Sequence, residues 1–296
     1  MTPNLTQAKP QKSATRRRLS FLIKLLLSAT ALFFVFRKID VQEAWQTFLQ
    51  TNPLYLILAF LSFNISKIAA AWRFKAYLKA LNIHISNRYN IELLYLGMFY
   101  NLFLPGSISG DGYKVYLLKQ QFDVKTKQLI GATLLDRLSG LALLLIMAGG
   151  FLLFSSFSSE IPYFNIAVTI LIVAVLPVFY LFNKLLFPQL TSAFGVTTFW
   201  SLWVQTGQVL TALLLLSSIS IEAYYLDYLT LFMVSSVVAV LPFTIGGVGA
   251  RELVFLYGFQ YLEIQQEAAI TFTLIFFLVT ALSSLLGLFV SIKKDN

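Results

Sequence analysis

The sequence predicts an all-α polytopic membrane protein, with six full transmembrane helices and two re-entrant pairs of broken helices arranged as an inverted repeat. Hydrophobic residues make up 58% of the 296 positions, charged residues make up 12%, and the mean hydropathy is +0.76. Such a composition is not that of a soluble domain. Several apolar runs also reach the roughly 20 residues with which a helix crosses a hydrocarbon core of about 30 Å. Two further apolar segments are interrupted by Pro and Gly.

The first expected span covers residues 19–36 and follows a basic segment, residues 1–18, that we expect to be a disordered tail. Three consecutive arginines, at positions 16–18, precede the apolar run. No small-residue cleavage pattern follows before Arg37 and Lys38, so the run is interpreted as a transmembrane helix and not as a signal peptide.

Five more runs are long and apolar enough to span, namely residues 53–72, 128–154, 163–182, 200–220 and 268–292. Segment 91–118 lies between the second and third spans and is broken at Pro105 and Gly106. Segment 226–261 lies between the fifth and sixth spans and is broken from 242 to 249. The halves of these segments, about 10 to 15 residues each, are too short to span alone.

The distribution of basic residues favours broken segments that enter the membrane and leave on the same side. With a cytoplasmic N-terminus, the inner side then collects nearly all basic residues, including Arg73, and the outer side keeps Arg37 and Lys38. If the broken segments spanned, Lys119, Lys125 and Lys127 would lie outside. We therefore expect cytoplasmic termini, with residues 293–296 as a short tail. Because the basic residues flank apolar runs, the formal charge of +9 does not indicate nucleic-acid binding.

Residues 104–114 (LPGSISGDGYK) and 241–251 (LPFTIGGVGAR) repeat one pattern at an offset of 137 positions. The single transmembrane domain, residues 19–292, then divides into halves of about 19–156 and 163–292. Each half holds three crossings, and an odd number of crossings inverts the second half relative to the first. This geometry predicts that both glycine-rich turns meet near the middle of the membrane.

A glycine-rich bend that leads into a helix presents unpaired N–H groups and the positive end of the helix dipole, which together attract anions. We expect the bends to contribute the following groups to a substrate site: the matched cations Lys114 and Arg251, the hydroxyls of Ser107 and Thr244, and the glycines Gly106, Gly110, Gly112, Gly246, Gly247 and Gly249. Asp111 and Glu252 have no acidic counterpart in the other copy, and one hypothesis is that they neutralise neighbouring cations. The simpler alternative is that both motifs are flexible breaks, with glycines for close helix packing.

Asp136 and Arg137 lie about nine residues past Lys127, or about 13 Å into the membrane at the helical rise. Adjacent helical residues point about 100° apart, so each is expected to have its partner elsewhere. Two interpretations remain open: a structural pairing with Lys114 or Glu252, or a role in the substrate cavity. Lys24, Lys67, His84 and Glu92 are expected to be structural.

No cysteine is present, so neither a disulfide nor a thiolate metal site is expected. The sequence also contains no ATP-binding motif and no catalytic constellation. We expect no cofactor, no metal ion and no enzymatic activity.

The stretches NLFLPGSISGDGYKVYLL, DRLSGL and LPFTIGGVGARELVFLYGF resemble the lysylphosphatidylglycerol synthase transmembrane-region family. That family includes the flippase portion of the multiple peptide resistance factor. The resemblance implies a bacterial or archaeal plasma membrane and a headgroup path lined by Lys114, Arg137 and Arg251. The chain resembles a stand-alone member without the aminoacyl transferase domain, so lysyl transfer is not expected.

The resulting hypothesis is a lipid flippase that binds an anionic phospholipid headgroup at mid-membrane. One alternative is an intramembrane transferase acting on a lipid phosphate, with Asp111 as a base or metal ligand, although Mg²⁺ sites usually gather more than one carboxylate. Another alternative is a membrane partner that scaffolds a lipid-modifying enzyme without transporting lipid.

Overall fold

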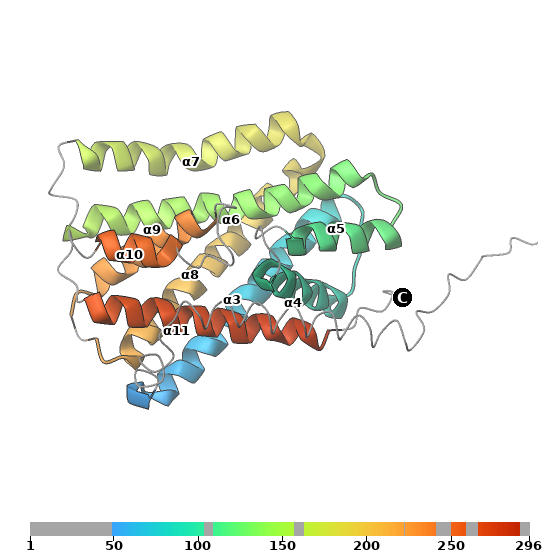
Figure 1. Ribbon diagram of the computed structural model, residues 1–296. Coiled ribbons are helices and arrows are strands. Elements are labelled where there is room, and N and C mark those ends of the chain that lie inside the picture. The colour runs from blue at the N-terminus through green and yellow to red at the C-terminus, as the bar shows by residue number, and fades with distance from the viewer. Residues whose placement is uncertain are drawn as a thin grey trace, which may run out of the picture. The chain divides into compact units, whose positions relative to one another are not determined.

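The computed structural model describes residues 49–103, 109–156, 163–221, 223–240, 250–258 and 266–290 (Figure 1). Every regular element in these ranges is a helix, which confirms the all-α prediction for this part of the chain. Five helical segments are long and apolar enough to cross a membrane: Pro53–Ala80, Thr126–Phe154, Phe164–Leu186, Pro188–Ser218 and Ile270–Leu288. The chain is thus a multi-pass membrane protein. The expected span 19–36 and the tails 1–18 and 293–296 lie outside the described residues.

Helix α3 (Pro53–Ala80) extends eight residues beyond the predicted span. Asn52 caps its start by accepting a hydrogen bond from the Leu54 N–H at 3.0 Å. The apolar run stops at Trp72, but the following residues contain no Gly or Pro, so the helix continues. Arg73 therefore belongs to this helix, where it is 7% exposed.

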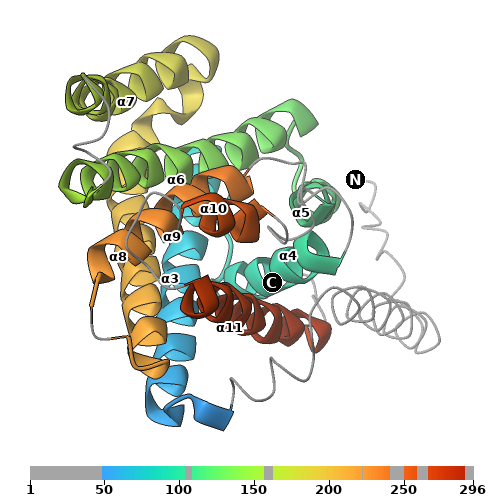
Figure 2. The same ribbon diagram turned by 60° about the vertical axis from the view of Figure 1, so that its left-hand side comes forward.

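Helix α8 (Phe194–Ser218) packs along α3 in the most extensive helix contact of the described residues. Small residues let the two backbones approach each other. The Ser62 hydroxyl donates to the Gly207 carbonyl at 3.1 Å, and a Cβ atom at Gly207 would lie 2.7 Å from the Ser66 Cβ. Figure 2 shows the two helices running side by side.

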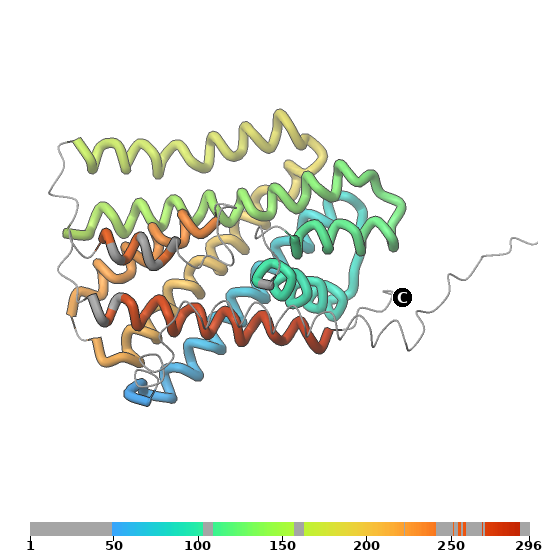
Figure 3. Tube along the Cα trace, in the orientation of Figure 1, coloured from blue at the N-terminus to red at the C-terminus, as the bar shows by residue number. Residues whose placement is uncertain are grey.

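The two interrupted segments each form a pair of short helices (Figure 3). Helix α4 (Asn87–Phe103) ends just before the first predicted interruption, and α5 (Ser109–Gln121) begins just after it. Likewise α9 (Tyr225–Val240) and α10 (Ala250–Gly258) lie on either side of the second. The helices within each pair pack against each other. The predicted interruptions themselves, within residues 104–108 and 241–249, lie outside the described residues.

The remaining helices surround these pairs. Helix α6 (Thr126–Phe154) contacts α5, α8 and α9, and α7 (Phe164–Leu186) lies beside α6 at the edge of the bundle. A 3₁₀ turn, η2 (Pro188–Ala193), joins α7 to α8. Helix α11 (Gln266–Leu285), followed by the 3₁₀ turn η3 (Leu286–Leu288), contacts α10 and α4. Polar residues from α3, α5 and α6 thereby come close to the second broken pair.

Candidate functional site

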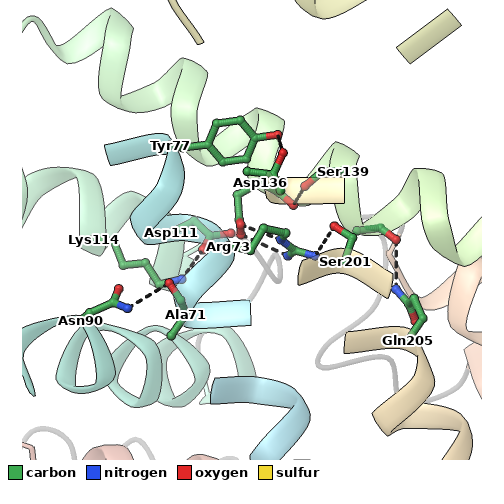
Figure 4. A network of polar contacts seen from close by, with 12 residues as sticks. Ala71, Arg73, Tyr77, Asn90, Asp111, Lys114, Asp136, Ser139, Ser201 and Gln205 are labelled. Atoms are coloured by element: carbon green, nitrogen blue, oxygen red, sulfur yellow. Dashed lines mark hydrogen bonds and ion pairs between the residues drawn. The ribbon is translucent and has the colours of Figure 1, made fainter. Parts of the chain in front are cut away.

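The adjacent residues Asp136 and Arg137 of α6 reach two different neighbours. Arg73 of α3 donates from Nε to Asp136 Oδ1 at 2.8 Å and from Nη2 to Oδ2 at 3.3 Å (Figure 4). Arg137 forms an ion pair with Asp111 of α5. The prediction of separate partners is therefore confirmed. Of the two open interpretations, a structural pairing of Asp136 with Lys114 is not what the described residues show, because the extended α3 places the Arg73 guanidinium beside Asp136. A pairing with Glu252 lies outside what the structure describes, as that side chain does.

The Arg73 guanidinium is enclosed by α6 and α8. Its Nη1 donates to the Ser201 hydroxyl at 3.2 Å, and a Cβ atom at Gly140 would lie 2.7 Å from the same nitrogen. Gln205 Nε2 donates to the Gly140 carbonyl at 3.0 Å and holds that part of α6 against α8. A bidentate arginine–carboxylate pair is geometrically specific, and burying it costs desolvation that only good geometry offsets. We therefore interpret the Arg73–Asp136 pair as a structural link between α3 and α6.

Asp111, on the first turn of α5, receives two cations. Its side chain is 9% exposed, Lys114 Nζ lies 3.2 Å from Oδ1, and Arg137 contacts Oδ2. Lys114 also lies over the Phe74 ring at 5.3 Å from the centroid. This arrangement matches the hypothesis that Asp111 neutralises neighbouring cations, and it ties α5 to α6.

Glycines 110 and 112 of the first motif have different surroundings. A Cβ atom at Gly110 would lie 2.0 Å from the Gly97 carbonyl oxygen of α4, whereas one at Gly112 would meet no atom within 4 Å. The Gly110 N–H donates to Asn101 Oδ1 at 2.9 Å, so α4 already satisfies this donor. Gly110 thus permits close helix packing, as the simpler alternative for the motif expects.

Arg251, on the first turn of α10, lies among aromatic rings and hydroxyls. Its Nη1 donates to Ser236 Oγ at 2.9 Å and to Ser235 Oγ at 3.3 Å. Its Cζ lies 4.4 Å from the Phe276 centroid and 5.2 Å from the Phe232 centroid. Cations are attracted to ring faces at such distances. The matched cations Lys114 and Arg251 are therefore held by different chemistry.

Lys67 is the residue that the sequence analysis set aside and that the structure brings next to the site. Its Nζ lies 4.7 Å from the Phe63 centroid, and the Phe63 ring packs edge to face on Phe276 at 5.9 Å. Arg251 and Arg73 are the charged groups that interact electrostatically with Lys67. Lys67 is the fifteenth of the 28 residues of α3, and this position in the middle of an apolar helix is the signal that could have identified it.

The structure therefore pairs Asp136 with Arg73 and brings Arg251 near Lys67, two α3 residues that are absent from the predicted site. Asp111 separately gathers Lys114 and Arg137. The other predicted residues, Gly106, Ser107, Thr244, Gly246, Gly247, Gly249 and the side chain of Glu252, lie outside what the structure describes.

Comparison with known proteins gives one finding. A family model described as the lysylphosphatidylglycerol synthase TM region matches residues 21–287. A search of curated proteins finds no match to this chain. The family match covers both broken-helix motifs and the Asp136–Arg137 pair between them, and extends over most of the sequence. The chain therefore belongs to the lysylphosphatidylglycerol synthase TM-region family, as the resemblance of its motifs indicated.

Proposed function

We propose that this protein is a lipid translocator that binds an anionic phospholipid headgroup near mid-membrane, between its two broken-helix pairs. The observation that carries the proposal is a cluster of ionisable side chains deep within membrane-spanning helices. Lys67 lies about 20 Å from either end of α3 at a rise of about 1.5 Å per residue. Asp136 lies about 15 Å from the start of the 29-residue helix α6 by the same measure. Ionisable groups at such depth usually mark substrate pathways.

The pattern of helix contacts supports an inverted repeat of six spans and two re-entrant pairs. The contact of α4 with α5 corresponds to that of α9 with α10, and the contact of α5 with α6 to that of α10 with α11. Helix α6 packs on α9 of the other half, and α11 packs on α4. A pseudo-two-fold axis through the α3–α8 contact accounts for these correspondences. Transporters built this way bind substrate where the halves meet.

In this proposal, the cations Arg251, Lys114 and Arg137 attract the headgroup phosphate. The backbone N–H groups of the two glycine-rich bends and the hydroxyls of Ser107 and Thr244 add further donors. The acyl chains stay in the surrounding lipid. Alternating exposure of the site to the two leaflets moves the lipid without making or breaking a covalent bond, so the protein is not an enzyme. A bacterial or archaeal inner-membrane location with both termini cytoplasmic is part of the proposal, and the charge pattern of the sequence supports it.

The test is reconstitution of the purified full chain in liposomes that contain labelled anionic phospholipid. We expect exchange of label between leaflets, and we expect Arg251→Ala to reduce the exchange rate at least about tenfold, because a charge-assisted contact contributes about 1.5–3 kcal/mol. Arg88→Ala is the matched control, since Arg88 is exposed and pairs only locally with Glu92. Undiminished exchange by folded Arg251→Ala would contradict the site. A modified lipid product would instead indicate a transferase. If neither leaflet exchange nor a modified lipid is observed, the result would indicate a scaffold.

A further inference from the structure

Three of the four tryptophans lie together where α3 packs on α8. The Trp72 and Trp200 rings stack with centroids 6.4 Å apart and planes 26° apart, and the Phe199 ring lies edge to face on Trp200, at 5.6 Å, and on Trp203, at 6.4 Å. Phe199 is 54% exposed and Trp203 is 55% exposed. We call these four side chains the tryptophan patch. Tryptophan rings on the outside of a membrane protein sit at the boundary between headgroups and hydrocarbon, so the patch marks that boundary on this face of the bundle.

Two lysines follow the tryptophan patch toward the end of α3. Trp72, Lys75 and Lys79 are spaced by three and four residues, and side chains at this spacing share one face of a helix. At the helical rise, Lys75 and Lys79 lie about 4.5 Å and about 10.5 Å beyond Trp72 along α3. Lys75 is partly exposed and Lys79 is exposed. Both ammonium groups therefore fall at the depth of the lipid headgroups, on the side that the sequence predicts to be cytoplasmic.

Lys75 is held in a defined position and retains free donors. Its Nζ lies 5.4 Å from the centroid of the Trp72 ring and donates to Asn87 Oδ1 of α4 at 2.6 Å. An ammonium group has three N–H donors, and Asn87 uses one of them. Lys75 belongs to none of the ion pairs between side chains that the structure describes. An anion that approaches from the lipid therefore meets a positioned positive charge that no described carboxylate neutralises.

We propose that Lys75 and the tryptophan patch bind one anionic phospholipid of the leaflet at this end of α3, with the phosphate on the Lys75 ammonium and the upper acyl chain along Trp203 and Phe199. A phospholipid fits better than free phosphate, because the site joins a cation to exposed rings that an acyl chain can cover. A zwitterionic phospholipid brings its own ammonium group close to Lys75 and Lys79, so a headgroup of net negative charge is preferred. The site is separate from the proposed mid-membrane site, since a lipid can bind here in a protein that moves none.

Tryptophan fluorescence measures the lipid preference of the patch. In the full chain carrying Trp45→Phe, the three tryptophans of the patch are the only ones left, and this parent protein is reconstituted in bilayers of phosphatidylglycerol and phosphatidylcholine. Either lipid carries brominated acyl chains, which quench rings that they touch, and the two quenching curves give the relative binding constant. We expect phosphatidylglycerol to be preferred about fivefold, which is the contribution of one lysine near the surface. Lys75→Arg is expected to keep this preference, and Lys75→Gln is expected to reduce it to less than about twofold.

Two controls separate a lipid site from general surface charge. Lys184→Gln removes the same charge from the exposed last turn of α7 and is expected to leave the preference unchanged. Quenching by brominated phosphatidylcholine alone is expected to be equal in every variant, which shows that the patch is folded and still faces lipid.

Three results overturn the proposal: equal binding of the two lipids by the parent protein, an unchanged preference in folded Lys75→Gln, or a loss in Lys184→Gln as large as that in Lys75→Gln. Inorganic phosphate added at constant ionic strength is expected to leave the preference intact. If it abolishes the preference, Lys75 binds a free anion and the assignment to a lipid is wrong. Exchange of lipid between leaflets enters none of these measurements, so a failure of translocation leaves their result unaffected.

Discussion

Lys114 and Arg251 occupy the same position of the repeated motif, yet the two halves of the chain surround them differently. Lys114 lies 3.2 Å from the carboxylate of Asp111, which also contacts Arg137. Arg251 contacts two serine hydroxyls and two phenylalanine rings. The described contacts of Lys114 thus include a carboxylate, whereas those of Arg251 are with hydroxyls and ring faces.

The difference extends beyond the motifs. The first half contributes Lys67, Arg73, Asp136 and Arg137, while the positions that align with Asp136 and Arg137 in the second half are Thr273 and Leu274. The second half contributes a buried cluster of Phe232, Phe255, Phe272 and Phe276 instead. The packing of the two halves thus places a polar network close to an aromatic cluster. Lys67 and Arg251 lie where the two meet.

The largest expected effect comes from breaking the polar network of the first half at Arg73. Arg73→Ala leaves the Asp136 carboxylate buried without its cation, so we expect a loss of about 3–5 kcal/mol in the free energy of unfolding. Unfolding in mixed micelles measures this loss. Replacing both partners, Arg73→Met with Asp136→Leu, is expected to recover most of it, because no uncompensated charge remains. A double variant as unstable as the single one would show that Arg73 acts mainly through Ser201 or Gly140.

A smaller effect is expected when the first half is made to resemble the second. Asp111→Asn removes the carboxylate that Lys114 and Arg137 share, and we expect a loss of about 1.5–3 kcal/mol in stability. The same change leaves two cations without their carboxylate, so affinity for short-chain phosphatidic acid should rise. Thermal unfolding with and without the lipid measures both quantities. A fall in affinity would mean that Asp111 contacts the ligand itself, which is the role that the transferase alternative requires.

The smallest expected effect tests what the motif glycines do. Gly110→Ala is expected to cost about 1–3 kcal/mol, because its Cβ atom would overlap the Gly97 carbonyl oxygen. Gly112→Ala has open space and is expected to gain up to about 1 kcal/mol from the higher helix propensity of alanine. Equal effects of the two substitutions would refute the packing role of Gly110. Loss of lipid binding in a stable Gly112→Ala variant would indicate that the headgroup approaches the helix at this position.

Much of the architecture follows from local patterns. Apolar runs predict the spans because a helix needs about 20 residues to cross, and the breaks fall where Pro and Gly accumulate. The end of α3 was harder to predict, because helix propensity continues after hydropathy falls. The partner of Asp136 lies 63 positions away, and no pattern within α6 indicates it. The sequence assigned Lys67 a structural role, since a lone lysine in an apolar run commonly extends toward the interface, and its proximity to Arg251 depends on packing between helices.

The sequence by itself determined the membrane class, the helical fold, the interrupted segments, the family and the separate directions of Asp136 and Arg137. These properties depend on composition and on the geometry of one helix, which neighbouring residues fix. Only the tertiary structure decided which charges meet: Arg73 with Asp136, Asp111 with two cations, and Lys67 near Arg251 across one aromatic cluster. The reason is physical, since ion pairing at depth depends on which helices pack together, and short-range sequence preferences do not encode that packing.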